Sequence, residues 1–247
     1  MKPIGPSYST EEFARDKEAA VQRMFTSIAR FYDCNNTLLS LGLHHLWKRL
    51  TVEEAALKPG DRVIDVGAGT FDLALRALPL VREKGEVVAI DLNEKMLRIG
   101  RAKAERRGSD RSIQTVVGSA ESIPFPDNAF DAALTGFCLR NVSDLPKAAR
   151  EICRVLKPGG KMACLEFSRP TRPVLRRLYD FYSFTLLPGL GTLVSRDQTG
   201  VYRYLPDSIR KFPDQASLTE IFLAAGFKTV RYRNLSGGIV AIHVGIK

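Results

Sequence analysis

The ten residues VIDVGAGTFD at positions 63–72 decide the fold. Residues 63–66 form a short apolar run that is typical of a buried parallel strand, and the glycine-containing turn after it leads into a helical stretch. Gly67 and Gly69 let the backbone approach a ligand at the carboxyl end of this strand, where open α/β sheets bind small molecules. The segment therefore predicts an α/β domain with a ligand site beside its first strand.

Short β-branched runs alternate with helical stretches downstream of this segment. The pattern predicts strands at 62–66, 86–91, 113–118, 131–136 and 161–167, and helices at 72–81, 94–107 and 145–156. Such alternation predicts a parallel sheet with helices on both faces. The tail adds two strand-like runs around the loop SGG at 236–238, which predict an antiparallel hairpin and complete a mostly parallel sheet of seven strands.

Residues 1–60 predict a helical cap on this sheet. Apolar residues at helical spacing follow a capping box formed by Ser9 and Glu12, and the stretch 37–56 predicts further helices interrupted near Gly42. The remaining residues, 61–247, are expected to form the Rossmann-like domain with a helical insertion at about 171–215, including an aromatic helix at 173–187. Cap and domain are expected to form one structural unit.

The composition restricts the partners and the location of the chain. The formal net charge of +10 attracts anionic partners such as nucleic acid, anionic lipid or acidic substrates. The four cysteines are widely spaced and include no CxxC pair, so neither a zinc site nor a disulfide framework is expected. Because the start lacks an apolar signal region and no apolar run could span a membrane, a cytoplasmic protein is expected.

The chemistry of the ligand follows from two further features. Asp91 ends the second predicted strand, about 20 residues after the glycine turn, where a carboxylate accepts the hydroxyls of a ribose. Position 72 is Asp where dinucleotide-binding loops have their third glycine, and DxGxGT is typical of methyltransferases, although dinucleotide binding stays an alternative. We therefore expect S-adenosylmethionine as the cofactor and S-adenosylhomocysteine as its product. The residues expected to contact it are Asp65, Gly67, Gly69, Thr70, Asp91, Leu92, Ser119, Ala120 and Gly136.

Five further blocks resemble one family. They lie at 31–49, 139–144 (LRNVSD), 154–170, 202–215 (beginning YRYLPDSI) and 225–245. With them the chain resembles the ubiquinone/menaquinone biosynthesis C-methyltransferases of the UbiE/MenG type. General class I methyltransferases share the cofactor loop and the Pro-Gly-Gly turn at 158–160, but not LRNVSD or the YRYLPDSI block. The resemblance implies the class I Rossmann-like fold and methyl transfer to a ring carbon of a polyprenyl quinol without a metal. The typical step is demethylmenaquinol to menaquinol, with the benzoquinol step of ubiquinone biosynthesis as the other acceptor.

The resemblance also suggests residues for the acceptor side. A ring carbon is a poor nucleophile until the neighbouring hydroxyl loses its proton, so the site needs a base or a cation. Arg140 is the leading candidate and Asn141 is expected to hold it in place, while a structural ion pair of Arg140 with a carboxylate such as Asp144 is the alternative. Tyr202 and Tyr204 are expected to contact the substrate, or else to form one face of a packed segment.

The chain departs from the family pattern at three positions near the cofactor. Phe71 stands where the family reads glycine, so either the loop opens or this ring covers part of the pocket and contacts the substrate. Gly136 and Cys138 replace a serine and a glycine that are common in the family. These departures leave two alternatives: a class I methyltransferase for another small aromatic or lipid substrate, and a non-catalytic scaffold whose site Phe71 blocks.

A polyprenyl tail resides in the bilayer, so contact with anionic membrane at the inner face of the cell membrane is expected. The N-terminal helices and residues 174–194 are candidates for it, and core helices with a solvated basic face are the alternative. Nucleic acid is not an expected partner, because the [DN]PP[YF] motif of base methyltransferases is replaced by GFCL at 136–139. The sequence leaves a homodimer open.

Overall fold

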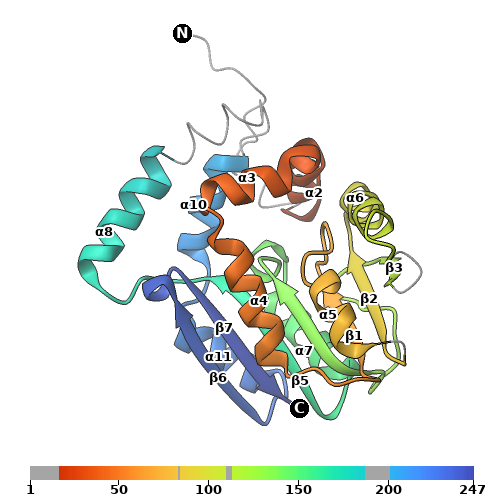
Figure 1. Cartoon of the computed structure of the whole chain (residues 1–247). Coiled ribbons are helices and arrows are strands. Elements are labelled where there is room, and N and C mark those ends of the chain that lie inside the picture. Colours follow the sequence, from red (N-terminus) through yellow and green to blue (C-terminus); the bar gives the residue numbers. More distant parts are fainter. Residues whose placement is uncertain (1–16, 83, 110–112, 187–200) are drawn as a thin grey trace.

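A computed structural model describes residues 17–82, 84–109, 113–186 and 201–247. Its centre is one seven-stranded sheet in the order β3-β2-β1-β4-β5-β7-β6 (Figure 1). The strands are β1 (Arg62–Val66), β2 (Glu86–Asp91), β3 (Ile113–Val117), β4 (Phe130–Gly136), β5 (Leu156–Phe167), β6 (Thr229–Leu235) and β7 (Val240–Ile246). The first five are parallel, and β7 runs antiparallel between β5 and β6. The predicted hairpin and seven-stranded sheet are confirmed.

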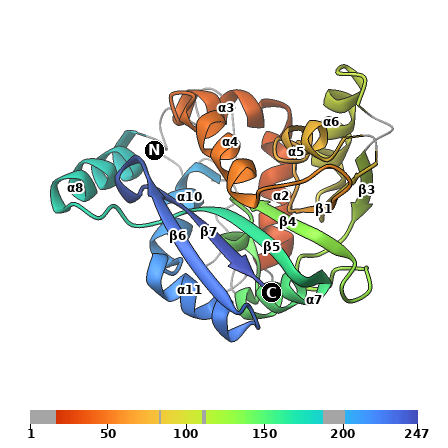
Figure 2. The same ribbon diagram turned by 60° about the horizontal axis from the view of Figure 1, so that its bottom comes forward.

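Helices cover both faces of this sheet (Figure 2). Side chains alternate along β1, so that Val63 faces one layer and Ile64 the other. The layer on the Val63 side contains α4 (Leu43–Ala55), α5 (Ala74–Val81) and α6 (Glu94–Glu105), and the opposite layer contains α7 (Leu145–Val155) and α11 (Gln215–Ala224). The strand order reverses between β1 and β4, and ligands bind at such a switch point in open α/β sheets.

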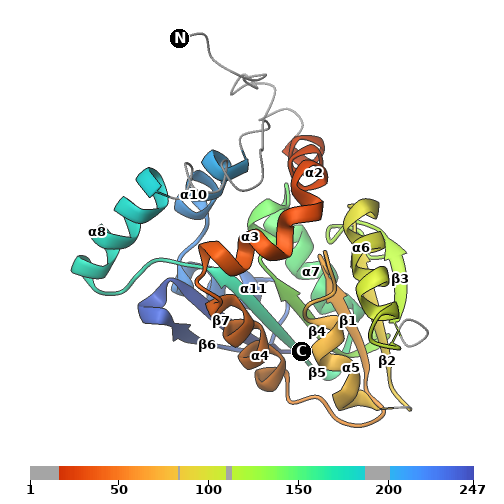
Figure 3. The ribbon, with the colours of Figure 1, turned by 45° about the horizontal axis from the view of Figure 1, so that its top comes forward.

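The N-terminal helices occupy two different places in the fold. Leu41 and Gly42 have positive φ angles of 50° and 76° and separate α3 (Tyr32–Leu39) from α4, which is the interruption that the sequence predicts. Helix α4 packs on β4, β5 and β7, so it belongs to a layer of the sheet. Helix α2 (Lys17–Ile28), followed by the 3₁₀ turn η1 (Ala29–Phe31), instead lies across the strand ends (Figure 3). The predicted capping box at Ser9 and Glu12 lies outside the described residues.

The insertion after β5 contains α8 (Pro173–Phe181), the π-helical turn η4 (Tyr182–Leu186) and α10 (Val201–Lys211). Helix α8 stands away from the sheet in Figures 1 and 3, and its base rests on the hairpin tip, where Thr171 N donates to Gly237 O at 3.0 Å. The helix predicted at 173–187 is α-helical as far as Phe181 and continues as a π-helical turn to Leu186. In the described part of the chain, no helix combines the length and apolarity that crossing a membrane requires.

Strand β5 begins earlier than predicted. It starts at Leu156, directly after α7, and the Lys-Pro-Gly-Gly turn lies within it as an irregularity in the pairing with β4. Gly159 adopts a φ of 80° there, a conformation that glycine reaches without strain. The turn therefore bends a strand and does not separate it from the helix.

Candidate functional site

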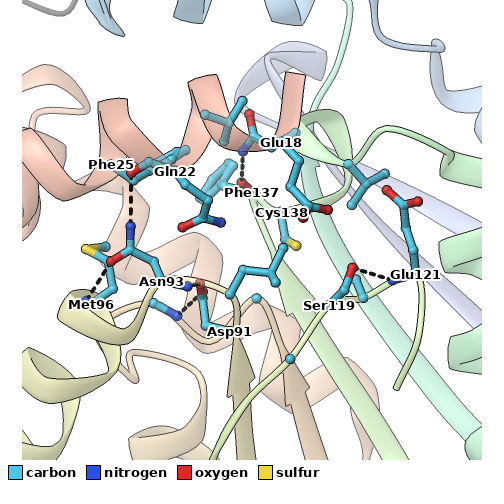
Figure 4. A pocket seen from close by; sticks show the side chains of 18 of the residues that line it. Glu18, Gln22, Phe25, Asp91, Asn93, Met96, Ser119, Glu121, Phe137 and Cys138 are labelled. Carbon is cyan, nitrogen blue, oxygen red and sulfur yellow. Dashed lines mark hydrogen bonds between the residues drawn. The ribbon is translucent and has the colours of Figure 1, made fainter. Parts of the chain in front are cut away.

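A pocket lies at the carboxyl ends of β1, β2 and β4, beneath α2 (Figure 4). Its open space is about 730 Å³, including the part open to solvent. The floor, as we call the side formed by the strand ends and the turns that follow them, includes Gly67, Gly69, Asp91, Leu92, Gly118, Ser119, Ala120 and Gly136. The roof is the face of α2 that carries Glu18, Val21, Gln22 and Phe25. The switch point of the sheet thus carries a site that α2 partly covers.

The glycine turn holds its shape through main-chain bonds. Gly67 N and Ala68 N both donate to Ile90 O of β2, at 2.9 and 3.0 Å. Gly67 has a φ of 71°, and a Cβ at this position would overlap the Cys138 side chain. Only glycine therefore satisfies both the backbone angle and the space, and the turn forms a cradle without side chains at the floor of the pocket.

Asp91 links this turn to the start of α6. Its carboxylate accepts hydrogen bonds from Gly69 N at 2.9 Å and from Asn93 N at 2.7 Å. Burial raises the pKa of Asp91 above its usual value, while these two hydrogen bonds oppose that shift. Each carboxylate oxygen has a second lone pair, so the fixed group retains acceptor capacity toward the pocket. The arrangement suits a ligand with neighbouring hydroxyl groups, such as a ribose.

Asp65 and Thr70, also predicted to contact the cofactor, lie behind the turn. Asp65 Oδ2 accepts from Ala74 N at 2.9 Å and so fixes the start of α5 against β1. Burial raises the pKa of Asp65 to about 7. Thr70 Oγ1 donates to Asp33 Oδ1 of α3 at 2.6 Å. Neither residue is among the described residues that line the pocket, so both are placed to support the turn.

The two loop positions that depart from known patterns have separate roles. The Phe71 ring is 1% exposed and packs against Gly100 of α6, in the core and outside the pocket lining. Asp72 lies between two ammonium groups, with Lys48 at 2.6 Å and Lys103 at 2.7 Å. Burial acts to raise the pKa of Asp72, but the two lysines hold it well below its usual value. The carboxylate at position 72 thereby fastens α4 and α6 to the turn.

The segments after β3 and β4 form the far side of the pocket. Ser119 Oγ accepts from Glu121 N at 3.1 Å. Glu121 Oε1 in turn accepts from Ser143 N at 2.7 Å and from Asp144 N at 3.1 Å. These bonds join the two segments, so Ser119 and Ala120, where the sequence predicts contact with the adenine, lie on the same side of the floor as the segment after β4.

The roof depends on side chains that the sequence analysis missed. At one end of α2, Lys17 Nζ donates to Arg140 O at 3.1 Å and to Val142 O at 2.6 Å. Along the helix, Asn93 Nδ2 donates to Gln22 O at 3.2 Å and to Thr26 Oγ1 at 2.8 Å. These bonds hold α2 to the segments after β4 and β2, across the opening of the pocket. The sequence offers one signal for these bonds, which is Asn93, two residues after Asp91 and in the position of a helix N-cap.

Arg140 forms a buried ion pair. Its Nη1 atom lies 3.1 Å from Glu166 Oε1 of β5, and the guanidinium stacks over the Phe167 ring at 5.2 Å. The sequence suggested Asp144 as its structural partner, but Asp144 instead caps α7 by accepting from Lys147 N at 2.8 Å. Arg140 is not among the described residues that line the pocket.

Asn141 and Tyr204 meet at the edge of the pocket. Tyr204 Oη donates to Asn141 Oδ1 at 3.1 Å, and Asn141 belongs to the pocket lining. Burial raises the pKa of Tyr204, with the charge of Arg140 opposing the shift, so the phenol stays protonated at neutral pH. Tyr202 lies on α10, and its side chain is outside what the structure describes. Tyr204 therefore contacts a residue that lines the pocket, and the described side chains do not test the prediction for Tyr202.

Comparisons with known proteins find similar sequences over nearly the whole chain. The model of the ubiE/COQ5 methyltransferase family matches residues 13–247. A ubiquinone/menaquinone biosynthesis C-methyltransferase UbiE of Francisella philomiragia is 44% identical over 96% of this chain and 95% of its own. The protein of that name from Yersinia enterocolitica is 48% identical over 94% of this chain and 92% of its own.

Solved structures share the fold at lower identity. An S-adenosylmethionine-dependent methyltransferase from Aquifex aeolicus superposes with a TM-score of 0.60 at 22% identity, covering 81% of this chain and 88% of that one. The [4+2]-cyclase SpnF superposes with a TM-score of 0.68 at 19% identity, covering 99% and 97%. The predicted Rossmann-like methyltransferase fold is confirmed, and its occurrence in a cyclase shows that the fold alone does not set the reaction.

Proposed function

The chain belongs to the ubiE/COQ5 methyltransferase family, and from this premise we propose that it transfers a methyl group from S-adenosylmethionine to a ring carbon of a polyprenyl quinol. Demethylmenaquinol is the proposed acceptor, with the corresponding benzoquinol as the second. The observation that carries the proposal is the pocket floor, where a side-chain-free glycine cradle stands beside the oriented carboxylate of Asp91.

The residues of the floor fit this cofactor. Asp91 would accept hydrogen bonds from the ribose hydroxyls, the Gly67–Gly69 turn would hold the methionine part, and Ser119 and Ala120 would contact the adenine, with no metal in the proposed reaction. Bound there, S-adenosylmethionine supplies an electrophilic methyl group on a sulfonium. Because α2 covers part of this floor, the roof would hold the acceptor ring near the methyl group, and such alignment provides much of the rate in a displacement reaction.

The acceptor side is proposed to consist of Asn141 and Tyr204, with Arg140 as a positioning residue. Arg140 Nη1 and Asn141 Nδ2 both donate to Phe137 O, at 2.8 and 3.1 Å, so the two side chains share one anchor. The protonated phenol of Tyr204 then orients the Asn141 amide by donating to it. Asn141 would in turn hydrogen-bond to the ring hydroxyl, and the proton of that hydroxyl would pass to water at the open part of the pocket before the carbon attacks.

Purified protein with S-adenosylmethionine and a demethylated naphthoquinol tests the proposal. Mass spectrometry should find a product heavier by one methylene group, and Asp91→Ala should lose both the product and the cofactor binding seen by calorimetry. Exposed Glu94, beside this segment on α6, provides the matched control Glu94→Ala, which should retain both. A protein that binds the cofactor but methylates neither a naphthoquinol nor a benzoquinol contradicts the proposed acceptor.

The alternative of a non-catalytic scaffold assumed that Phe71 blocks the site. Because Phe71 lies in the core, this residue no longer supports that alternative. We propose that the enzyme works in the cytoplasm with peripheral contact at the inner face of the membrane, where the polyprenyl tail of the acceptor resides. Quinone profiling of cells that lack the gene should find the demethylated quinone in place of the methylated one. The choice between monomer and homodimer is measured by light scattering.

A further inference from the structure

A second cavity lies between α8, α10 and the segment that follows β5. Its open space is about 720 Å³, including the part open to solvent. Three arginines line it, Arg169, Arg176 and Arg210, against the single carboxylate of Asp180. Asp180 lies 3.7 Å from Arg210, and it is the one acidic residue among the described residues that line the cavity. The lining therefore carries excess positive charge and favours an anionic ligand.

A buried hydroxyl in the same cavity also lacks a partner. Ser168 is 5% exposed, and its Oγ forms no hydrogen bond within the described part of the chain. A buried polar atom without a partner is unfavourable, and a ligand that bonds to it removes that penalty. Arginine side chains beside a hydroxyl donor are a combination that recognises phosphate oxygens.

The outer side of α8 has the opposite character. Val174, Leu178 and Phe181 recur at helical spacing and are 71%, 62% and 59% exposed. Helix α8 has no buried residue, and Figures 1 and 3 show it standing clear of the sheet. The stretch 168–181 contains four arginines and one aspartate. An apolar helix face next to basic side chains is typical of helices that lie in the interface of anionic membranes.

We propose that the arginine-lined cavity binds the phosphate group of an anionic phospholipid while Val174, Leu178 and Phe181 enter the bilayer. The inference deepens the proposed function, on which it rests for the lipid nature of the acceptor. The cavity is linked to the acceptor side of the pocket through neighbouring residues. Ser168 of the cavity follows Phe167, whose ring stacks on Arg140, and Arg140 precedes Asn141, which lines the pocket. A phospholipid held there places the membrane beside the site that the polyprenyl quinol must reach.

Vesicle flotation of the full chain tests this surface. The protein should float with phosphatidylglycerol vesicles and not with phosphatidylcholine vesicles. Leu178→Ser should weaken binding by about tenfold, because an exposed leucine loses its transfer into the bilayer. Arg176→Gln should weaken binding by about fivefold, through the loss of one cation at the headgroup. Both side chains are exposed, so neither substitution removes a core contact.

Matched controls separate the surface from general charge and apolarity. Leu223→Ser changes an exposed leucine on α11, and Arg101→Gln changes an exposed arginine on α6. Both controls should bind vesicles as the unmodified chain does. If Arg101→Gln weakens binding as much as Arg176→Gln, net charge accounts for the binding and the cavity proposal is overturned. Calorimetric binding of inorganic phosphate without vesicle binding overturns the lipid assignment.

Methyl transfer distinguishes failure of this inference from failure of the proposed function. Leu178→Ser and Arg176→Gln should lower the rate on a tail-bearing quinol in vesicles and leave the rate on a tail-less quinol unchanged. Methylation of the tail-less quinol by a protein that does not float defeats the docking surface alone. Flotation that depends on α8, without methylation of either quinol, supports the surface and defeats the proposed acceptor.

Discussion

The floor and the roof of the pocket are built in different ways. The floor consists of strand ends and the short turns after them, and its bonds are mostly to main-chain atoms, as between Gly67 N and Ile90 O. The roof is one helix, α2, held to segments far away in the sequence by side-chain bonds, chiefly those of its own Lys17 and of Asn93. Because the main-chain bonds of the floor do not involve α2, the floor can keep its shape while the roof is displaced. Such an arrangement suits an enzyme that must exchange its cofactor after each turnover.

The largest expected effect lies beneath the floor, at Asp65. With a pKa raised from 3.8 to about 7, the folded protein holds a proton there that the unfolded chain releases. The stability that this proton provides is complete below pH 3.8 and is lost as the pH rises toward 7. Asp65→Asn retains an acceptor for Ala74 N without titrating. Between pH 5 and pH 8, the free energy of unfolding of the variant should gain about 3 kcal/mol relative to the unmodified chain. Urea unfolding at both values measures this gain, and a constant difference means that Asp65 is already ionised in the folded protein at pH 5.

The next effect breaks the floor itself. Gly67→Val forces a left-handed angle and an overlap with Cys138, so affinity for S-adenosylmethionine should fall by at least about 100-fold in calorimetry. Gly60→Val is the control, because Gly60 has a φ of 94° but open space around it. The control should lose stability through backbone strain and keep its affinity for the cofactor. Equal affinity losses in both variants would mean that strain, and not the shape of the cradle, determines binding.

A smaller effect loosens only the roof. Asn93→Ser keeps a side chain that can cap α6 but removes the bonds to Gln22 O and Thr26 Oγ1. The cofactor should dissociate about tenfold faster in stopped-flow measurements, as expected from the loss of two hydrogen bonds. Thr26→Val, which removes one of these bonds from the side of α2, should give a part of the same effect. An unchanged dissociation rate in both variants would show that the roof does not retain the cofactor.

The smallest effect concerns the acceptor side. Tyr204→Phe removes the hydrogen bond to Asn141 and should lower kcat about fivefold, at unchanged affinity for the cofactor. Tyr232→Phe on β6 is the matched control, since its ring is 45% exposed and outside the pocket lining. Steady-state kinetics on the quinol measures both variants. A loss of cofactor affinity in Tyr204→Phe would place this tyrosine on the floor side of the site.

The same contrast explains which parts of the molecule the sequence predicts. Gly67, Gly69 and Asp91 could be named because strand, turn and acid follow one another at fixed spacing, and the structure brings them into one pocket with Ser119 and Gly136. Their contact with the cofactor remains a prediction. The sequence predicts a helical cap at 1–60, but not the contacts that make α2 the roof or the Glu166 partner of Arg140. A contact between residues 17 and 142 or 140 and 166 leaves no local pattern in the chain.

Phe71 and Gly100 have a consequence for relatives of this protein. The aromatic ring occupies the space into which a Cβ at position 100 would project, so the two positions share one volume. A loop with glycine at 71 vacates that volume and relieves the positive φ of 68° found here. In an alignment of relatives the two positions should therefore covary, with a side chain on the helix wherever the loop has none. Phe71 and Gly100 then represent a paired substitution within the core, and Phe71 does not bear on the choice of acceptor.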